Sequence, residues 1–128
     1  MKKQIATEQA PKAVGPYSQA VLANGFLFVS GQIPLNPATG QLVAGDIKAQ
    51  AERIFQNIGA ILAQAGLSFS DVVSATVYLT DIHDFAAVNQ VYGKFFSEGT
   101  LPARSAVQIA ALPKGARLEA SCVAAERA

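Results

Sequence analysis

Two residues of opposite charge are candidates for chemistry in a chain that has few charged side chains. Arg104 follows the segment 101–103 at the head of a predicted strand, where its planar guanidinium can bind a carboxylate through two parallel hydrogen bonds. Glu119 lies in an otherwise apolar run, where an acid can orient water or carry a proton. Each also has a plainer interpretation: Arg104 as a surface arginine paired with an acid, and Glu119 as one half of a cross-strand ion pair.

Three further positions could contact a ligand. Ser30-Gly31 comes at the end of a hydrophobic strand, and a glycine there exposes backbone groups without a Cβ in the way. Tyr17 follows a Gly-Pro pair, and its phenol could close a pocket. Asn89 falls between apolar positions of a predicted helix. The alternatives are a simple turn at Ser30-Gly31, a core position for Tyr17 and a solvent-facing amide at Asn89.

The sequence offers no second catalytic system. His83 is the single histidine, in a predicted turn, so we interpret it as a capping or surface residue. The chain has no HExxH, CxxC or nucleotide-binding glycine motif, and we expect neither a metal nor another cofactor. No serine is placed beside His83 for a Ser-His-Asp arrangement. Cys122 stands among small residues of a strand and is predicted to be buried.

Composition favours one self-associating domain over residues 1–128. The chain is 51% hydrophobic and 15% charged, with a formal net charge of +1. That balance gives no long-range attraction to nucleic acid or to an anionic membrane. Residues 13–45 contain no charged side chain, which predicts a subunit interface. A lone cysteine and an N-terminus without an apolar h-region predict a cytoplasmic protein.

Hydrophobic periodicity predicts the order β-β-β-α-β-α-β-β. The clearest helix covers 46–65, with Asp46 as N-cap and Gly66 just after its end. A second helix covers 85–97 with Asp84 as its cap, and its apolar stripe is Phe85, Val88, Tyr92 and Phe95. Strands are expected to begin at 5–6 and to cover 17–22, 26–30, 71–80, 104–109 and 117–125.

These elements predict an α+β fold with a mixed sheet of four to six strands and both helices on one face. Gly31 is expected to end the strand 26–30, in which Leu27 and Val29 face away from Phe26 and Phe28. In the strand 71–80, strict alternation puts Val73, Ala75, Val77 and Leu79 on one side. The uncovered face of the sheet would then be hidden by trimeric or similar packing.

Five segments, taken in order, resemble one known family. They are Ile5–Pro11, Gly15–Ala20, Ser30–Pro34, Pro102–Ser105, and Leu112-Pro113-Lys114 with Leu118-Glu119. The pattern is similar to the RidA/YjgF family of reactive-intermediate deaminases, also labelled endoribonuclease L-PSP. The resemblance covers essentially the whole chain. It implies a chorismate-mutase-like fold and a homotrimer with ligand sites in the clefts between subunits.

The resemblance also implies an activity. Its substrates are 2-aminoacrylate and 2-iminobutanoate, released by pyridoxal-phosphate-dependent serine and threonine dehydratases. They are hydrolysed to 2-oxo acids and ammonia without a cofactor. By correspondence, Arg104 binds the substrate carboxylate and Glu119 positions the attacking water, while Tyr17, Ser30, Gly31 and Asn89 are substrate-binding. One departure is that Ala106 stands where some members carry cysteine, which argues against a thiol in the core reaction.

Two other functions remain as alternatives. One is a metabolite-binding or chaperone-like trimer without turnover, which would keep Arg104 but would not need Glu119. The other is a ribonuclease or translation inhibitor. Ribonuclease chemistry usually needs two acid–base groups or a metal, and nucleic-acid binding needs a basic patch, so the sequence favours this function least.

Overall fold

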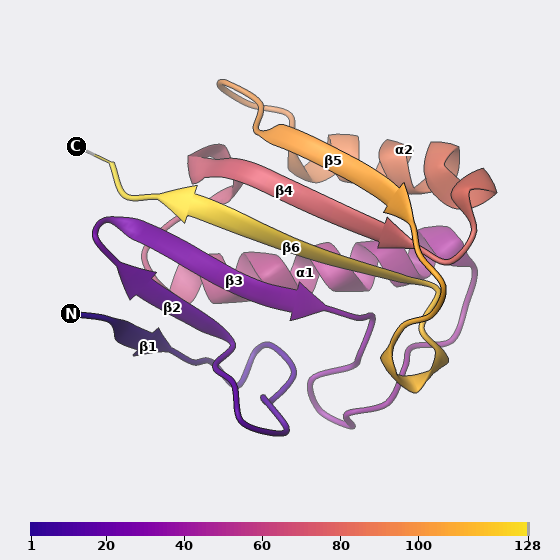
Figure 1. The fold of residues 1–128 in the computed structure, drawn as a ribbon, viewed down its shortest axis with the longest axis horizontal. Coiled ribbons are helices and arrows are strands. Elements are labelled where there is room, and N and C mark those ends of the chain that lie inside the picture. Colours follow the sequence, from indigo (N-terminus) through magenta and orange to yellow (C-terminus); the bar gives the residue numbers. More distant parts are fainter. Residues whose placement is uncertain (128) are drawn as a thin grey trace.

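The computed structural model describes residues 1–127, which form six strands and two helices (Figure 1). The strands are β1 (Lys3–Ile5), β2 (Ala20–Ala23), β3 (Phe26–Gln32), β4 (Val72–Leu79), β5 (Ala103–Gln108) and β6 (Leu118–Ala125). The helices are α1 (Ile47–Gln64) and α2 (Phe85–Phe95), and the short 3-10 turns are η1 (Phe69–Asp71), η2 (Ile82–Asp84) and η3 (Pro113–Gly115). Neither helix is long and apolar enough to cross a bilayer. The predicted element order is confirmed.

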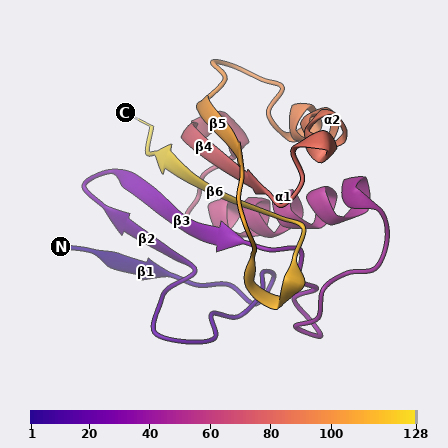
Figure 2. The same ribbon diagram turned by 45° about the vertical axis from the view of Figure 1, so that its right-hand side comes forward.

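The strands form one mixed sheet in the order β1-β2-β3-β6-β4-β5. All neighbours are antiparallel except β4 and β5, which are parallel and are joined through α2. Both helices lie behind the sheet in Figure 1, and Figure 2 shows α2 beside the β4–β5 end. The predicted α+β class, with both helices on one face, is therefore confirmed. This topology makes β5 an edge strand and β6 a central one.

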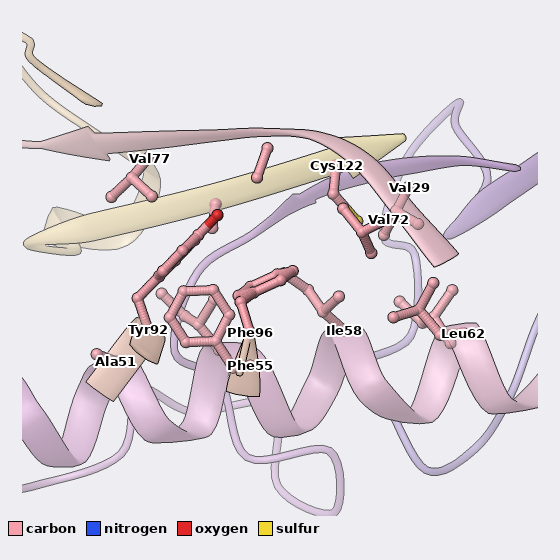
Figure 3. Packing of buried hydrophobic residues seen from close by; sticks show 14 of the residues in the cluster. Val29, Ala51, Phe55, Ile58, Leu62, Val72, Val77, Tyr92, Phe96 and Cys122 are labelled. Atoms are coloured by element: carbon pink, nitrogen blue, oxygen red, sulfur yellow. The ribbon is translucent and has the colours of Figure 1, made fainter. Parts of the chain in front are cut away.

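The core lies between the sheet and α1, as Figure 3 shows. The apolar stripe of α1 is buried, and each fully buried aliphatic side chain stabilises the fold by roughly 1.5–3 kcal/mol. Asp46 caps the helix by accepting a hydrogen bond from the Ala49 amide at 2.9 Å. Gly66 follows the helix end with φ +76°, a backbone conformation that glycine adopts at no steric cost. Both predicted ends of this helix are confirmed.

The face of the sheet away from the helices carries large apolar side chains that remain exposed. Phe26 and Phe28 of β3 are 44% and 50% exposed, and Val107 of β5 is 41% exposed. Leu27 and Val29 point the other way, as predicted, and are buried. Apolar surface of this kind on a sheet face is typical of an interaction site.

The strict alternation predicted for β4 is wrong at Val73. Val72 pairs with Ala124 while Ser74 pairs with Val123, so the strand has one extra residue at this point. Such a β-bulge shifts the alternation by one residue. Val72 is therefore buried and Val73 is 44% exposed, whereas Ala75, Val77 and Leu79 share one side, as predicted, and are buried.

Several predicted boundaries also need correction. The first strand does not begin at residues 5–6, because β1 begins at Lys3 and ends at Ile5. Tyr17 precedes β2, which begins only at Ala20. Gly31 does not end β3, because the strand continues to Gln32. Helix α2 ends at Phe95 rather than near residue 97.

Asp84 is the N-cap residue of α2, as predicted, but it does not cap the helix through its side chain. Its carboxylate accepts a hydrogen bond from Arg117 at 3.0 Å, an interaction across 33 residues that local sequence does not reveal. Asp81 instead caps η2 by accepting from the His83 amide at 2.9 Å. His83 is on the surface, as expected.

Candidate functional site

Arg104 is the second residue of the edge strand β5, and its side chain lies on the helix side of the sheet. It pairs in register with Ala75, which is buried against the helices. The guanidinium donates a 2.6 Å hydrogen bond from Nη1 to Oδ1 of Asn89. Its Cζ lies 4.7 Å from the centre of the Tyr92 ring and 5.3 Å from that of Phe85. Arg104 therefore contacts α2 through an amide and two aromatic rings.

No acid pairs with Arg104 in residues 1–127. No carboxylate there lies within 4.0 Å of its guanidinium. The interpretation of Arg104 as one half of a surface ion pair is thus wrong for this part of the chain. A guanidinium presents a planar fork of donors, and those not used by Asn89 remain to bind a planar anion.

Glu119 lies on the opposite face of the sheet, in the central strand β6. Its neighbours Leu118 and Ala120 are buried toward the helices, so alternation directs Glu119 to the other side. The side chain is partly buried, and this burial raises the pKa of its carboxyl above the usual value. It forms no ion pair within the described residues, so the cross-strand pair is also not found. A carboxylate of raised pKa is a stronger base.

Gly31 leaves space for the Glu119 side chain in its observed position. Between Val29 and Gln32, two residues of β3 face a single residue of β6, which is a β-bulge. A Cβ added at Gly31 would lie 2.7 Å from Cδ of Glu119 and closer still to Oε2. The Glu119 carboxylate therefore packs directly against the bulge, and a side chain at position 31 would force it to move.

Ser30 of the same bulge forms two hydrogen bonds to the segment that carries Tyr17. The Ser30 hydroxyl donates to the Ser18 carbonyl at 2.6 Å, and the Ser30 amide donates to the Gln19 carbonyl at 2.9 Å. Tyr17 itself is half-exposed. Together Tyr17, Ser30, Gly31 and Glu119 line a cavity of about 800 Å³. Four of the six predicted site residues are thus brought together.

The other two, Arg104 and Asn89, are brought together elsewhere. They lie on the helix side of the sheet, whereas Glu119 lies on the other face, and neither of them lines the Glu119 cavity. The candidate site in one chain consequently has two halves. We call them the Arg104 half (Phe85, Asn89, Tyr92, Arg104) and the Glu119 half (Tyr17, Ser30, Gly31, Glu119).

Sequence comparison identifies the family. Residues 7–126 match the family described as Endoribonuclease L-PSP. This chain belongs to that family, which is also called RidA/YjgF. The resemblance seen in its sequence motifs is confirmed.

Relatives in the family carry different names. The chain is 54% identical over 125 residues to "Protein DfrA" of Myxococcus xanthus, which covers 96% of this chain and 95% of the relative. It is 49% identical over 126 residues to 2-iminobutanoate/2-iminopropanoate deaminase of the goat, Capra hircus, covering 98% and 91%. Among solved structures, that of Escherichia coli TdcF with bound serine matches with a TM-score of 0.92 and 46% identity, covering 98% and 99%.

Several residues of the candidate site in this L-PSP family member were not predicted from its sequence. Lys12 and Lys114 also line the Glu119 cavity, and Lys114 has φ +58°, in the left-handed region that non-glycine residues seldom adopt. The Pro-Lys-Gly turn carries no signal that its lysine would take this conformation. Phe85 and Tyr92 had been interpreted only as core residues. Phe85 lies four residues before Asn89 and Tyr92 lies three residues after it, so all three share one helix face. This spacing could have identified both rings from the sequence.

Cys122 is buried, as predicted, and burial raises the pKa of its thiol to about 12. A thiol of this kind stays protonated near neutral pH and is a poor nucleophile. Within residues 1–127, no group of three or more His, Cys, Asp or Glu is arranged to hold a metal ion.

Proposed function

We propose that this protein hydrolyses reactive 2-imino and enamino acids, such as 2-iminobutanoate and 2-aminoacrylate, to 2-oxo acids and ammonia. The observation that carries the proposal is the pair of half-sites: a guanidinium without an acidic partner among residues 1–127 and a carboxylate of raised pKa. The name of the goat relative supports the reaction. The TdcF structure with bound serine supports a ligand whose carboxylate is attached to the carbon that bears the nitrogen.

The two half-sites need a second subunit. Because they lie on opposite faces of one sheet, the Arg104 half of one chain would complete a cleft with the Glu119 half of its neighbour. A homotrimer would achieve this and cover the exposed Phe26 and Phe28 at the same time. In that assembly each cleft would take residues from two chains.

The chemistry follows from these parts. The iminium carbon C2 is electrophilic, and an enamine such as 2-aminoacrylate reaches the iminium by taking a proton at C3. Arg104 binds the carboxylate and so fixes C2, while Glu119 accepts a proton as the oxygen of water bonds to C2. The proton then passes to the amine nitrogen of the tetrahedral intermediate. The C–N bond breaks, ammonia leaves, and the hydroxyl loses its proton to become the 2-oxo group.

The remaining residues shape this cleft. Tyr17, Ser30 and Gly31 would line the substrate cavity on the Glu119 side. Asn89 would line it beside Arg104, to which it is hydrogen-bonded. No cofactor is needed, because water is the co-substrate and the iminium is already activated. We place the protein in the cytoplasm, beside the pyridoxal-phosphate-dependent dehydratases that release such imines.

The test is oxo-acid release in a coupled assay with a threonine dehydratase. The protein should accelerate the appearance of 2-oxobutanoate, and no acceleration at any concentration would refute the proposal. Glu119→Gln separates an enzyme from a binding protein of the same shape. We expect kcat to fall by roughly 10²–10⁴-fold while 2-oxobutanoate still binds. Undiminished turnover in Glu119→Gln would exclude the proposed base.

A further inference from the structure

The groups around Arg104 hold its side chain in place without neutralising it. We propose that Asn89, Phe85 and Tyr92 are positioning residues that form an uncharged cradle for Arg104. The cradle keeps the full charge of the guanidinium available for the carboxylate of a 2-imino or 2-oxo acid. This inference rests on the proposed function, and it assigns Asn89 to the arginine rather than to the substrate.

Asn89 determines the direction in which the guanidinium points. A guanidinium has only donors, so the atom of Asn89 that faces it must be the acceptor Oδ1. The 2.6 Å distance from Nη1 to Oδ1 is short for a neutral acceptor. An aspartate in this place would accept the same hydrogen bond but would also pair with the charge. The amide therefore orients Arg104 and leaves its charge without compensation.

The rings of Tyr92 and Phe85 support the guanidinium from the helix. Tyr92 is buried, and its own ring is held by stacking on Phe96 at 4.3 Å between centroids and by an edge contact with Phe55 at 5.7 Å. A rigid ring 4.7 Å from Cζ attracts the cation through its π face. The Tyr92 hydroxyl is buried and has no hydrogen-bond partner within residues 1–127. The ring, not the hydroxyl, is thus the part that serves Arg104.

The other arginines of the chain are held differently. Arg117 binds Asp84 at 3.0 Å, and Arg127 binds both carboxylate oxygens of Asp71, at 3.0 and 2.9 Å. Arg53 donates to the amide of Asn57 at 3.0 Å, but it has no aromatic ring beneath it in the described residues. Only Arg104 combines a neutral acceptor with two rings in this part of the chain.

That Arg104 forms no ion pair with the described part of the chain has a direct consequence for binding. If Arg104 were paired with an acid, an incoming carboxylate would have to displace it, and the affinity would fall by the strength of the internal pair. A side chain held in place beforehand also loses less conformational entropy when the ligand binds. The cradle therefore favours tight binding of a small anion by one arginine.

Asn89→Asp tests the charge part of the proposal, since it changes charge but not size. We expect 2-oxobutanoate, titrated by calorimetry at low ionic strength, to bind at least about 10-fold more weakly. KM for the imine should rise by a similar factor, with a smaller change in kcat. The matched control is Gln90→Glu, which adds the same charge at the next exposed position, where the side chain accepts from Lys48. Equal effects of both variants, or an unchanged affinity in Asn89→Asp, would overturn the proposal.

Tyr92→Leu and Phe85→Leu test the aromatic part. We expect each to weaken 2-oxobutanoate binding by about three-fold through the lost cation–π contact. Tyr92→Phe, which keeps the ring, should restore the affinity lost in Tyr92→Leu. Rotation of the ¹⁵N-labelled Arg104 guanidinium, followed by NMR, should be slow in the wild type and in Tyr92→Phe and faster in Tyr92→Leu. Equal rotation rates in these three proteins would overturn the cradle.

The NMR arm separates this inference from the proposed function. If the wild type neither hydrolyses the imine nor binds 2-oxobutanoate, the proposed function fails, and with it the ligand assigned to the cradle. In that case the NMR rotation rates alone test whether the rings hold the Arg104 guanidinium in place. If the wild type is active but Asn89→Asp binds normally, only the inference fails.

Discussion

The Arg104 half and the Glu119 half of the site place a charged group in opposite environments. Arg104 lies exposed on an edge strand and is oriented by an amide and two rings. Glu119 lies on a central strand, partly buried against the Gly31 bulge, with its pKa raised by burial. An exposed, uncompensated cation is suited to bind an anion, whereas a desolvated carboxylate is suited to take a proton. One chain thus presents a cation suited to binding and a carboxylate suited to proton transfer on separate faces of its sheet, and we call these the binding half and the basic half of the proposed site.

The largest expected effect comes from the binding half. Arg104→Ala would remove the two charge-assisted hydrogen bonds that we propose for the substrate carboxylate, so kcat/KM should fall about 100-fold or more. Binding of 2-oxobutanoate should be lost as well, while light scattering should show an unchanged oligomer. Full activity in this variant would remove the binding half from the site.

Mixed oligomers test whether the halves come from different chains. In a trimer assembled from equal amounts of Arg104→Ala and Glu119→Gln subunits, about a quarter of the clefts would combine an intact Arg104 with an intact Glu119. Activity should therefore recover to about that fraction of the wild-type value. No recovery, despite verified mixing of subunits, would mean that both residues act within one chain.

Gly31→Ala should damage the basic half by displacing the Glu119 carboxylate. The added Cβ would lie 2.7 Å from Cδ of Glu119. We expect kcat to fall about 10-fold or more, while the free energy of unfolding changes by no more than about 1 kcal/mol, because the group that must move is the end of a flexible side chain. Gly93→Ala is the matched control, because nothing lies within 4 Å of its Cβ in α2. It should raise the unfolding free energy by roughly 0.5–1 kcal/mol and leave turnover unaltered.

The smallest effect is on pH dependence. Burial raises the pKa of Glu119, so kcat/KM should rise with pH through a value above that of an ordinary glutamate. Stability should change in the opposite direction. A raised folded-state pKa contributes stability that is fully present below the unfolded-state pKa and is lost as pH rises through the folded-state value. Glu119→Gln should lack both changes, and the same kcat/KM limb in that variant would assign it to another group.

Much of the fold could be predicted because its signals are local. The period of three and four in α1, with a capping aspartate before it and a glycine after it, depends on neighbours within a few turns of helix. The β-bulges at Val73 and Gly31 could not be predicted in this way. Each arises because paired strands differ by one residue over a stretch, and the pairing partner is distant in sequence. The same reason explains why Asp84 pairs with Arg117 instead of capping α2 through its side chain.

The predictions for the candidate site divide in the same way, between what local sequence reveals and what long-range pairing sets. The ordered family motifs point to Arg104 and Glu119 and also contain Tyr17, Ser30 and Gly31, whereas Asn89 lies outside them, and alternation along each strand gives its residues two faces. Which face each residue takes depends on the tertiary structure. Strand order and bulges place Arg104 over α2 and Glu119 on the far side of the sheet. Long-range backbone pairing sets these positions, and a one-residue shift in register reverses the face on which a side chain lies.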